Sequence, residues 1–531
     1  MNNILYYGGP ILTLADPLYV EAVLVQKGKI ACCGTLGEVR ARADGETIEV
    51  NLEGRTLMPS FIDAHSHLSH VADAQAYAGL AGCRSAEEIG ERLRDWARQN
   101  HVERGQWIIG SGYDHNDLPG QAHPTAAQLD AYLPDNPVVI THTSGHMGVV
   151  NTKGLRELAI CADTPDPTGG RIGHDASGAL NGYLEENALI QRTRQIPHPT
   201  QEQRMKNLEK AQQLYLSYGI TTCQDGKING TDFEFLAAAA KGGLLQLDTV
   251  AYVDMKNNED LLRQQAPYRT YQRNLRLGGY KIFLDGSPQG RTAWMSEPYI
   301  GGREGYKGYP IYTDDAVREF CETALRENAQ LLAHCNGDAA SEQFVCAYEK
   351  ALESTHSKNE IRPVMVHAQT VRPDQLERMA RVKMMASFFV AHTYYWGDVH
   401  RQNFGDERAM RISPTKTALE KGVRFTFHQD APVVPPDMWL TVWCAVNRIS
   451  KGGAVMGAGE RISTLEALKA VTVNAAYQYF EEDSKGTIEA GKLADLMIVD
   501  RDPLKTADME LRDIQVLATI KEGFTLWEKK Q

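Results

Sequence analysis

The sequence predicts an α/β fold in which a (β/α)8 barrel carries a small β-domain and a large insertion after its first strand. Three observations support this prediction. Apolar strand-like segments alternate with helical segments over much of the chain, short strands lie at both ends, and one long stretch lacks the alternation. The 531 residues suffice for two or more domains, and equally for one barrel with an insertion and a satellite.

The two ends of the chain carry the short strand-like segments. They lie at residues 23–31, 47–57, 495–499, 514–520 and 523–527. The N-terminal group alone is too small to bury its own core, so it needs a partner. We therefore expect residues 1–57 and 485–531 to pair with each other in one β-domain.

The middle of the chain, residues 58–484, contains eight predicted barrel strands. They begin at Phe61 and continue at residues 220–225, 247–253, 280–285, 330–334, 363–367, 383–389 and 423–428. Strands that alternate with helices form a parallel sheet, and eight of them predict a closed TIM barrel. Residues 68–218 interrupt the alternation after the first strand, and we expect this insertion to form a lid or wall over a site.

Composition and charge narrow the classes of function. Hydrophobic residues make up 42% and charged residues 23%, and the net charge of −12 argues against a nucleic-acid partner. No apolar run approaches the ~20 residues of a membrane span, and the first residues lack the pattern of a signal peptide. Nine scattered cysteines without a Cys-x-x-Cys pair favour reduced thiols and a cytoplasmic location.

Polar residues follow the predicted strands at the end where such barrels carry their active sites. His65 and His67 stand at i and i+2, so on a strand both imidazoles point to one side. His334, His367 and Asp430 end the fifth, sixth and eighth strands. A single buried histidine is more often an ordinary core residue. Because all four imidazoles and the carboxylate share one end of the strands, a divalent metal centre is the better explanation.

Five motifs resemble the amidohydrolase superfamily, in the branch that includes N-substituted formamide deformylases. They are Phe-Ile-Asp-Ala-His-Ser-His at 61–67, Tyr-Lys-Ile-Phe-Leu-Asp-Gly-Ser at 280–287, Ala-His-Cys-Asn-Gly-Asp at 333–338, Val-His-Ala-Gln at 366–369 and Gln-Asp-Ala-Pro at 429–432. The segment 486–500 is also typical of this superfamily, so the resemblance covers nearly the whole chain. It implies a (β/α)8 barrel with a flanking β-sandwich and one or two divalent metal ions, most often zinc.

The resemblance also implies a role for each ligand. The implied metal ligands are His65, His67, Lys281, His334, His367 and Asp430. Lys281 would be carboxylated and bridge two ions, because a cationic amine cannot bind a metal and its pKa of ~10.4 must first be lowered by burial. The alternative is a lysine in a salt bridge, with Asp285 near in sequence; the site would then hold a single ion.

The chemistry implied by these roles is hydrolysis. Metal-bound water acts as hydroxide, Asp430 serves as catalytic acid and base, and His392 is a candidate donor to the oxyanion, with an ordinary loop histidine as the alternative. The candidate substrate-binding residues are Tyr113, Asp114, His146, Arg291 and His392. Residues 394–396, Tyr-Tyr-Trp, predict either an aromatic wall for an apolar substituent or ordinary packing at the barrel rim. Gln429 departs from the serine more usual in the branch, which affects the positioning of Asp430.

The predicted function is metal-dependent cleavage of a C–N bond in an amide, N-formyl or N-acyl amine. Two alternatives stay open: a deaminase or cyclic amidase of the same superfamily, and a non-catalytic relative that binds or regulates. We expect a small-molecule substrate and no nucleic-acid or membrane partner, and the resemblance allows a homodimer.

Overall fold

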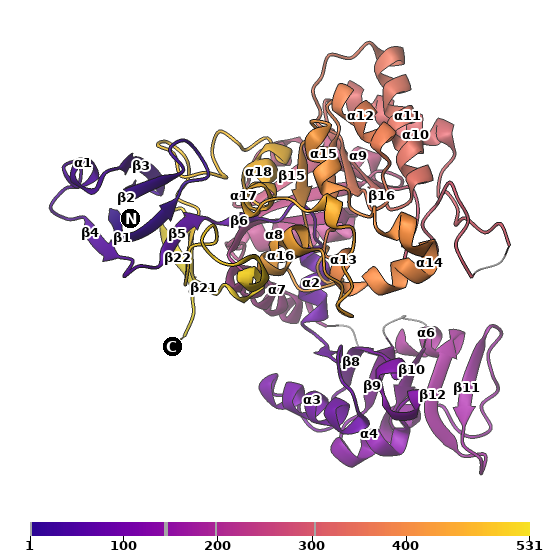
Figure 1. The fold of residues 1–531 in the computed structure, drawn as a ribbon. Coiled ribbons are helices and arrows are strands. Elements are labelled where there is room, and N and C mark those ends of the chain that lie inside the picture. Colours follow the sequence, from indigo (N-terminus) through magenta and orange to yellow (C-terminus); the bar gives the residue numbers. More distant parts are fainter. Residues whose placement is uncertain (1–2, 143–146, 197–198, 302–303, 531) are drawn as a thin grey trace. The chain divides into compact units, whose positions relative to one another are not determined.

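The computed structural model describes residues 3–142, 147–196, 199–301 and 304–530 (Figure 1). The chain divides into two compact units, Met1–His70 with Ala211–Gln531 and Val71–Lys210. The predicted insertion, 68–218, contains the whole second unit. The finer division into a β-domain (1–57 with 485–531) and a barrel (58–484) stays a prediction. Among the described helices, none has the length and apolarity needed to cross a bilayer.

The first unit is built on a sheet of eight parallel strands, and a strand is present at each predicted position. In spatial order they are β6 (Phe61–Ile62), β13 (Ile220–Ile228), β14 (Asp248–Asp254), β15 (Leu275–Phe283), β16 (Gln330–Cys335), β17 (Val364–His367), β18 (Met385–Phe388) and β19 (Phe425–Phe427). Each strand pairs in parallel with the next one in this order. β15 begins five residues before its predicted start, because Leu275 already pairs with Thr249 of β14.

Helices follow these strands, which establishes the predicted α/β class. Those of the first unit are α1 (Leu36–Arg40), α8 (Gly230–Lys241), α9 (Glu259–Gln264), α10 (Asp314–Arg326), α11 (Asp338–Thr355), α12 (Pro373–Arg381), α13 (His392–Tyr395), α14 (Gly397–Ala409), α15 (Thr415–Glu420), α16 (Met438–Asn447), α17 (Thr464–Ala470) and α18 (Val473–Gln478). In α10 the Thr313 side chain caps the amide of Ala316, and Val317, Cys321 and Ala324 form the buried stripe.

A second sheet of the first unit joins the two chain ends. Its order is β22 (Phe524–Glu528), β21 (Val516–Lys521), β20 (Leu496–Val499), β5 (Thr56–Pro59), β1 (Ile4–Leu12), β2 (Tyr19–Gln26) and β3 (Lys29–Gly34), with β4 (Ile48–Asn51) on β1. β20 pairs antiparallel with β5, so the indigo and yellow ends of the chain meet here (Figure 1). The expected pairing of the ends is therefore present, whereas their arrangement as a sandwich stays a prediction.

The second unit has a mixed sheet of six strands. Its order is β11 (Gly170–His174), β12 (Leu180–Glu186), β10 (Met147–Val150), β9 (Val138–His142), β8 (Ile108–Tyr113) and β7 (Ala78–Gly79). Its helices are α3 (Ala86–Gln99), α4 (Ala126–Tyr132), α5 (Thr152–Glu157) and α6 (Asn187–Thr193), and α2 (Leu68–Ala74) and α7 (Gln201–Ser217) cross the limits between the units. Apolar runs at residues 107–109 and 138–140 indicate β8 and β9 in the sequence, whereas the other strands of this unit are short or contain glycine.

Candidate metal centre

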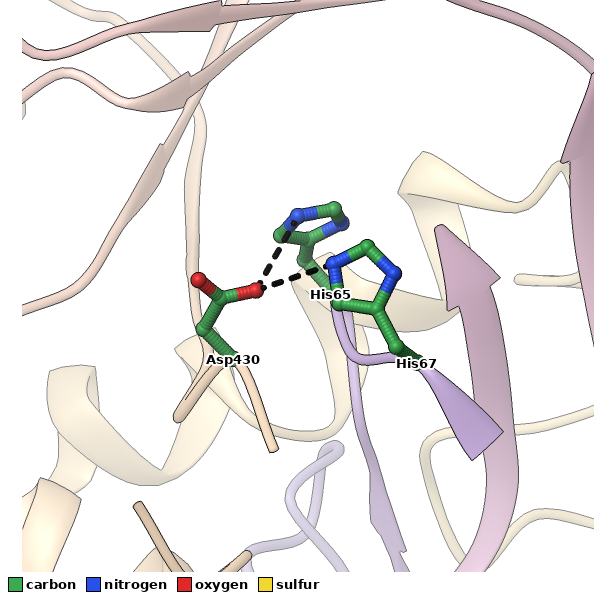
Figure 2. Close-up of side chains that lie close together, drawn as sticks. All are labelled: His65, His67 and Asp430. Atoms are coloured by element: carbon green, nitrogen blue, oxygen red, sulfur yellow. Dashed lines mark ion pairs between the residues drawn. The ribbon is translucent and has the colours of Figure 1, made fainter. Parts of the chain in front are cut away.

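Three of the predicted ligands converge beyond the ends of the outermost parallel strands. His65 and His67 follow β6, and Asp430 follows β19. Asp430 Oδ1 lies 3.4 Å from His65 Nε2 and 3.3 Å from His67 Nε2, and Figure 2 shows the three side chains pointing toward one another. The backbone N–H of His67 donates to the carbonyl of Ala431, which holds the two segments together.

The spacing of these three atoms fits a metal ion. Ligand atoms around a tetrahedral ion with bonds of about 2.0–2.1 Å stand about 3.3–3.4 Å apart. Asp430 Oδ1 is buried and accepts no well-oriented hydrogen bond from the residues that the structure describes. A buried acceptor without a hydrogen bond destabilises the folded protein unless a ligand or an ion binds it. The donor set and the uncompensated oxygen therefore both suit a divalent cation.

The tautomer of His65 can be deduced from its neighbours. Gln224 donates through Nε2 to the Ala64 carbonyl and the Tyr479 hydroxyl, so its Oε1, 2.5 Å from His65 Nδ1, must accept. His65 Nδ1 therefore carries the proton, and Nε2 presents a lone pair to Asp430. Burial, with nearby Lys281, holds the pKa of His65 well below its ordinary value, so the ring is neutral as a metal ligand requires.

His334 has the same kind of support from Asp285. Its Nδ1 lies 3.1 Å from Asp285 Oδ1, so Nδ1 donates. Nε2, which lies 3.3 Å from Asn336 Nδ2, then carries the lone pair that an ion would need. Asp285 also accepts the backbone N–H groups of Trp294, Asn336 and Gly337. The carboxylate that sequence offered as a salt-bridge partner for Lys281 is thus engaged in orienting His334.

His367 is the fourth histidine predicted to bind the metal. Its ring centroid is 4.5 Å from that of His334 and 5.7 Å from that of His65. His367 Nδ1 lies 3.1 Å from His428 Nε2, and His428 Nδ1 lies 2.9 Å from the Ser387 hydroxyl. Burial lowers the pKa of His428 to about 3, so this orienting chain is uncharged at neutral pH.

Lys281, in β15, belongs to the same cluster. The side chain is fully buried, and its Nζ is 3.3 Å from His65 Nε2. Burial lowers the pKa of Lys281 to about 7, although the charge of Asp430 acts in the opposite direction. An amine with a pKa lowered in this way loses its proton far more readily near neutral pH than an ordinary lysine does.

The backbone is strained where it presents two of these groups. His367, Ala368 and Asp430 adopt φ values of 71°, 45° and 56°, in the left-handed region that non-glycine residues rarely occupy. Such conformations persist only where the surroundings impose them, and they concentrate at functional sites. Gln429 anchors this segment, because its amide donates to the Asp437 carbonyl and to the Thr441 hydroxyl. Gln429, which stands where the resembling branch more often has serine, therefore holds the segment of Asp430 in place through its own hydrogen bonds.

His392 and Arg291 have partners within the protein. His392, at the start of α13, is buried against Phe389, and its Nδ1 lies 3.0 Å from His400 Nε2. Arg291 donates from Nε to the Asn403 side chain and from Nη1 to the Gly301 carbonyl. These contacts fix both side chains, and their predicted roles toward a substrate stay predictions.

The predicted substrate residues of the insertion lie in the second unit. Tyr113 is buried in the core of that unit, and its hydroxyl is 2.8 Å from His123 Nδ1. Asp114 lies beside His115 and His142, two residues that sequence reasoning did not select. His146 lies outside the described residues. A substrate contact for any of the three stays a prediction.

Three residues that were not predicted from the sequence orient the ligands. Asp285 and His428 lie just beyond the carboxyl ends of β15 and β19, as several ligands do, whereas Gln224 lies in the middle of β13. A position at the end of a predicted strand was the sequence feature that could have identified Asp285 and His428. It did not separate them from ordinary buried polar residues, because their partners depend on the register between strands.

Parallel strands that bring imidazoles, a carboxylate and a buried lysine to their carboxyl ends define a class of protein, the metal-dependent hydrolases. Comparison with known proteins agrees with this class. The sequence profile of the Amidohydrolase family matches residues 49–526. The chain therefore belongs to that family, and it is a metal-dependent hydrolase that acts on C–N bonds.

Individual relatives match over almost their full length. The N-substituted formamide deformylase of Arthrobacter pascens is 29% identical, with 96% of this chain and 95% of the relative covered. The putative amidohydrolase YtcJ of Bacillus subtilis is 27% identical, with 99% of each chain covered. The crystal structure of an uncharacterized metal-dependent hydrolase from Pyrococcus furiosus has a TM-score of 0.75 at 28% identity, covering 95% of this chain and all of that one.

Proposed function

We propose that the protein hydrolyses the C–N bond of an N-formyl or other N-acyl amine. The observation that carries the proposal is the approach of His65 Nε2 and His67 Nε2 to within 3.4 Å of Asp430 Oδ1. The similarity to an N-substituted formamide deformylase supports the substrate class. Proposed metal ligands are His65, His67, Lys281, His334, His367 and Asp430, and proposed substrate contacts are Tyr113, Asp114, His146, Arg291 and His392.

The parallel sheet is proposed to close into a (β/α)8 barrel around this centre. The ring of His65, which follows the first strand, is 5.2 Å from the ring of His428, which follows the last. Ile62, Tyr252 and Leu332, from three different strands, pack in one buried cluster. Both observations support closure, and the joined chain ends support a flanking β-sandwich.

The centre is proposed to hold one or two zinc ions, with Lys281 carboxylated in the two-ion form. The neutral amine of Lys281 would attack carbon dioxide, forming a C–N bond and releasing one proton, and the resulting carbamate would supply two oxygens. A pKa near 7 supports this, because an ordinary lysine keeps its proton at neutral pH. The engagement of Asp285 by His334 argues against the salt-bridge alternative.

Asp430 is proposed to move the proton during hydrolysis. A bound divalent ion would supply Lewis acidity, lowering the pKa of a water molecule from 15.7 toward about 7 and polarising the scissile carbonyl. Burial alone would raise the pKa of Asp430, yet His67, His428 and Lys281 hold it below its ordinary value. As a carboxylate, Asp430 accepts the proton of the attacking water and returns it to the amine nitrogen when the C–N bond breaks.

His392 is proposed to donate a hydrogen bond to the oxyanion. Its Nδ1 faces His400 Nε2, and His400 Nδ1 is buried with no hydrogen-bond partner among the described residues. A buried unpaired N–H is rarer than a buried unpaired acceptor, so the proton of His400 belongs on Nε2. His392 then accepts at Nδ1 and carries its own proton on Nε2. That tautomer has the donor that a developing oxyanion needs.

The substrate is proposed to carry an apolar or aryl group on its nitrogen. The ring of Trp396 packs 4.5 Å from that of His392 and 5.9 Å from that of Phe389, with Tyr395 beside it. All three aromatic residues at 394–396 are only partly buried, so they keep surface that a substituent can cover. A cytoplasmic location and a homodimer rest on the sequence and the resemblance alone, and both stay predictions.

The test is a product assay with metal-replete protein. N-benzylformamide and matched N-acetyl amines are incubated with the enzyme, and released amine and carboxylic acid are both quantified. We expect the two products in equal amounts. Release of ammonia from an amino-heterocycle, without activity on any acyclic amide, would instead favour the deaminase, and opening of a cyclic amide would favour the cyclic amidase.

A further inference from the structure

A second group of potential metal ligands lies in the second unit, in its loop after β8 and at the end of β9. Asp114 directly follows β8, His115 begins a short 3-10 helix (His115–Asp117), and His142 is the last residue of β9. β8 and β9 are paired in parallel, with Tyr113 opposite His142. The sheet therefore brings together residues that are 27 positions apart in sequence.

The three ligand atoms form a compact triangle. His115 Nδ1 is 3.0 Å from His142 Nε2, His142 Nε2 is 3.4 Å from Asp114 Oδ1, and His115 Nδ1 is 3.7 Å from Asp114 Oδ1. The point equidistant from three atoms spaced in this way lies about 2.0 Å from each, which matches zinc–nitrogen and zinc–oxygen bonds. The triangle thus fits an ion without movement of the side chains.

Neighbouring aromatic side chains pack against the residues that form this triangle. The ring of His123 stacks on that of His115 with centroids 4.4 Å apart, and His123 Nδ1 lies 2.8 Å from the Tyr113 hydroxyl. His142 is almost completely buried, whereas the side chains of His115 and Asp114 are 26% and 35% exposed. An ion bound here would therefore keep access to water at its remaining coordination positions.

We propose that Asp114, His115 and His142 bind a divalent cation with a preference for nitrogen and oxygen ligands, such as zinc. Two imidazoles and one carboxylate are a common donor set for zinc, and three ligands from the part of the chain that the structure describes are one fewer than a closed structural site uses. The proposal goes beyond the hydrolytic function, because none of these residues belongs to the proposed catalytic centre. It also gives Asp114 a ligand role that differs from the predicted substrate contact.

The competing explanation is a hydrogen-bond network without a metal. His142 Nε2 lies 3.0 Å from His115 Nδ1 and 3.4 Å from Asp114 Oδ1, so a single proton on this nitrogen can be shared between the two acceptors. Such a network needs only protons and binds zinc weakly. The two explanations therefore predict different numbers of zinc ions bound per chain.

The experiment measures zinc per chain after equilibration with excess zinc and removal of the unbound ion. We compare the wild-type protein with the double variant His115→Ala/His142→Ala and with His101→Ala, an exposed histidine of the same unit. We expect the double variant to lose one equivalent and His101→Ala to lose none. Equal zinc content in all three folded proteins would overturn the proposal, since any excess would then be adventitious.

A second measurement needs no variant and covers the case in which the double variant fails to fold. Crystals of the wild-type protein grown with zinc are measured at the zinc absorption edge. We expect an anomalous peak about 2 Å from the three ligand atoms. A well-ordered Asp114–His115–His142 cluster without such a peak would overturn the proposal, whatever the catalytic centre contains.

Discussion

The two histidine clusters of this protein use the same donor types in different surroundings. At the centre of the first unit, His65, Lys281 and His367 are completely or almost completely buried. Gln224, Asp285 and His428 fix the ring orientations there. His67 and Asp430 of that centre have side chains that are 13% and 15% exposed, whereas His115 and Asp114 of the second unit are 26% and 35% exposed. This difference indicates that suitably spaced ligand atoms are enough to bind a metal ion. Hydrolysis also needs burial, which shifts the pKa values of the groups that take part in it.

The largest expected effect is a fall in kcat, and it distinguishes the carboxylate of Asp430 from that of Asp114. Asp430→Asn removes the group that moves the proton, and we expect kcat to fall by about 10³-fold or more. Asp114→Asn removes a ligand of the other cluster and a proposed substrate contact, so we expect KM to rise. We expect kcat to stay within about threefold of wild type, since that carboxylate has no proposed part in proton transfer. Steady-state kinetics on the formamide substrate measures both. Equal losses in the two variants would erase the distinction between the clusters.

The next effect concerns the buried lysine, which has no counterpart among the ligands of the second cluster. Lys281→Ala should lower kcat by about 10²-fold, because the bridging carbamate can no longer form. Added propionate, a small carboxylate that fits the space left by the side chain, should restore part of the activity. Lys241→Ala, at an exposed lysine that ends α8, is the control and should respond to neither change. A fully active Lys281→Ala variant would rule out the carbamate.

A smaller effect tests the orientation of His392. His400→Leu removes the donor to His392 Nδ1, so the proton of His392 is no longer confined to Nε2 and kcat should fall about tenfold with little change in KM. His400→Gln retains a donor and should recover most of the loss. The same substitution at the histidine that stacks in the second cluster, His123→Leu, should leave kcat nearly unchanged. A rise in KM alone for His400→Leu would argue for a packing role.

The smallest effect is the dependence on pH. The pKa of Lys281 is lowered to about 7, so its amine gains a proton as the pH falls through that value and loses the ability to form a carbamate. We therefore expect kcat/KM to be nearly constant above about pH 8 and to fall about fourfold between about pH 8 and about pH 6.5. Zinc content measured along the same series shows whether metal loss accompanies the fall. A flat profile across this range would contradict the role of Lys281.

The sequence predicted the parts of the structure that follow from local patterns. The eight parallel strands and the pairing of the chain ends follow from apolar segments of strand length. His65 and His67 were visible because a single residue separates them. The cluster at Asp114 was missed because His142 comes from another strand, and only the pairing of β8 with β9 brings it close. Short strands such as β7, with two residues, carry too little pattern to predict the sheet that positions this cluster.

The most direct test of the central claim is an anomalous diffraction measurement at the zinc edge on crystals of the metal-replete enzyme. The account predicts a peak within about 2.3 Å of His65 Nε2, His67 Nε2 and Asp430 Oδ1. Ordered side chains at these three positions with no peak between them would contradict a metal-dependent mechanism at this centre.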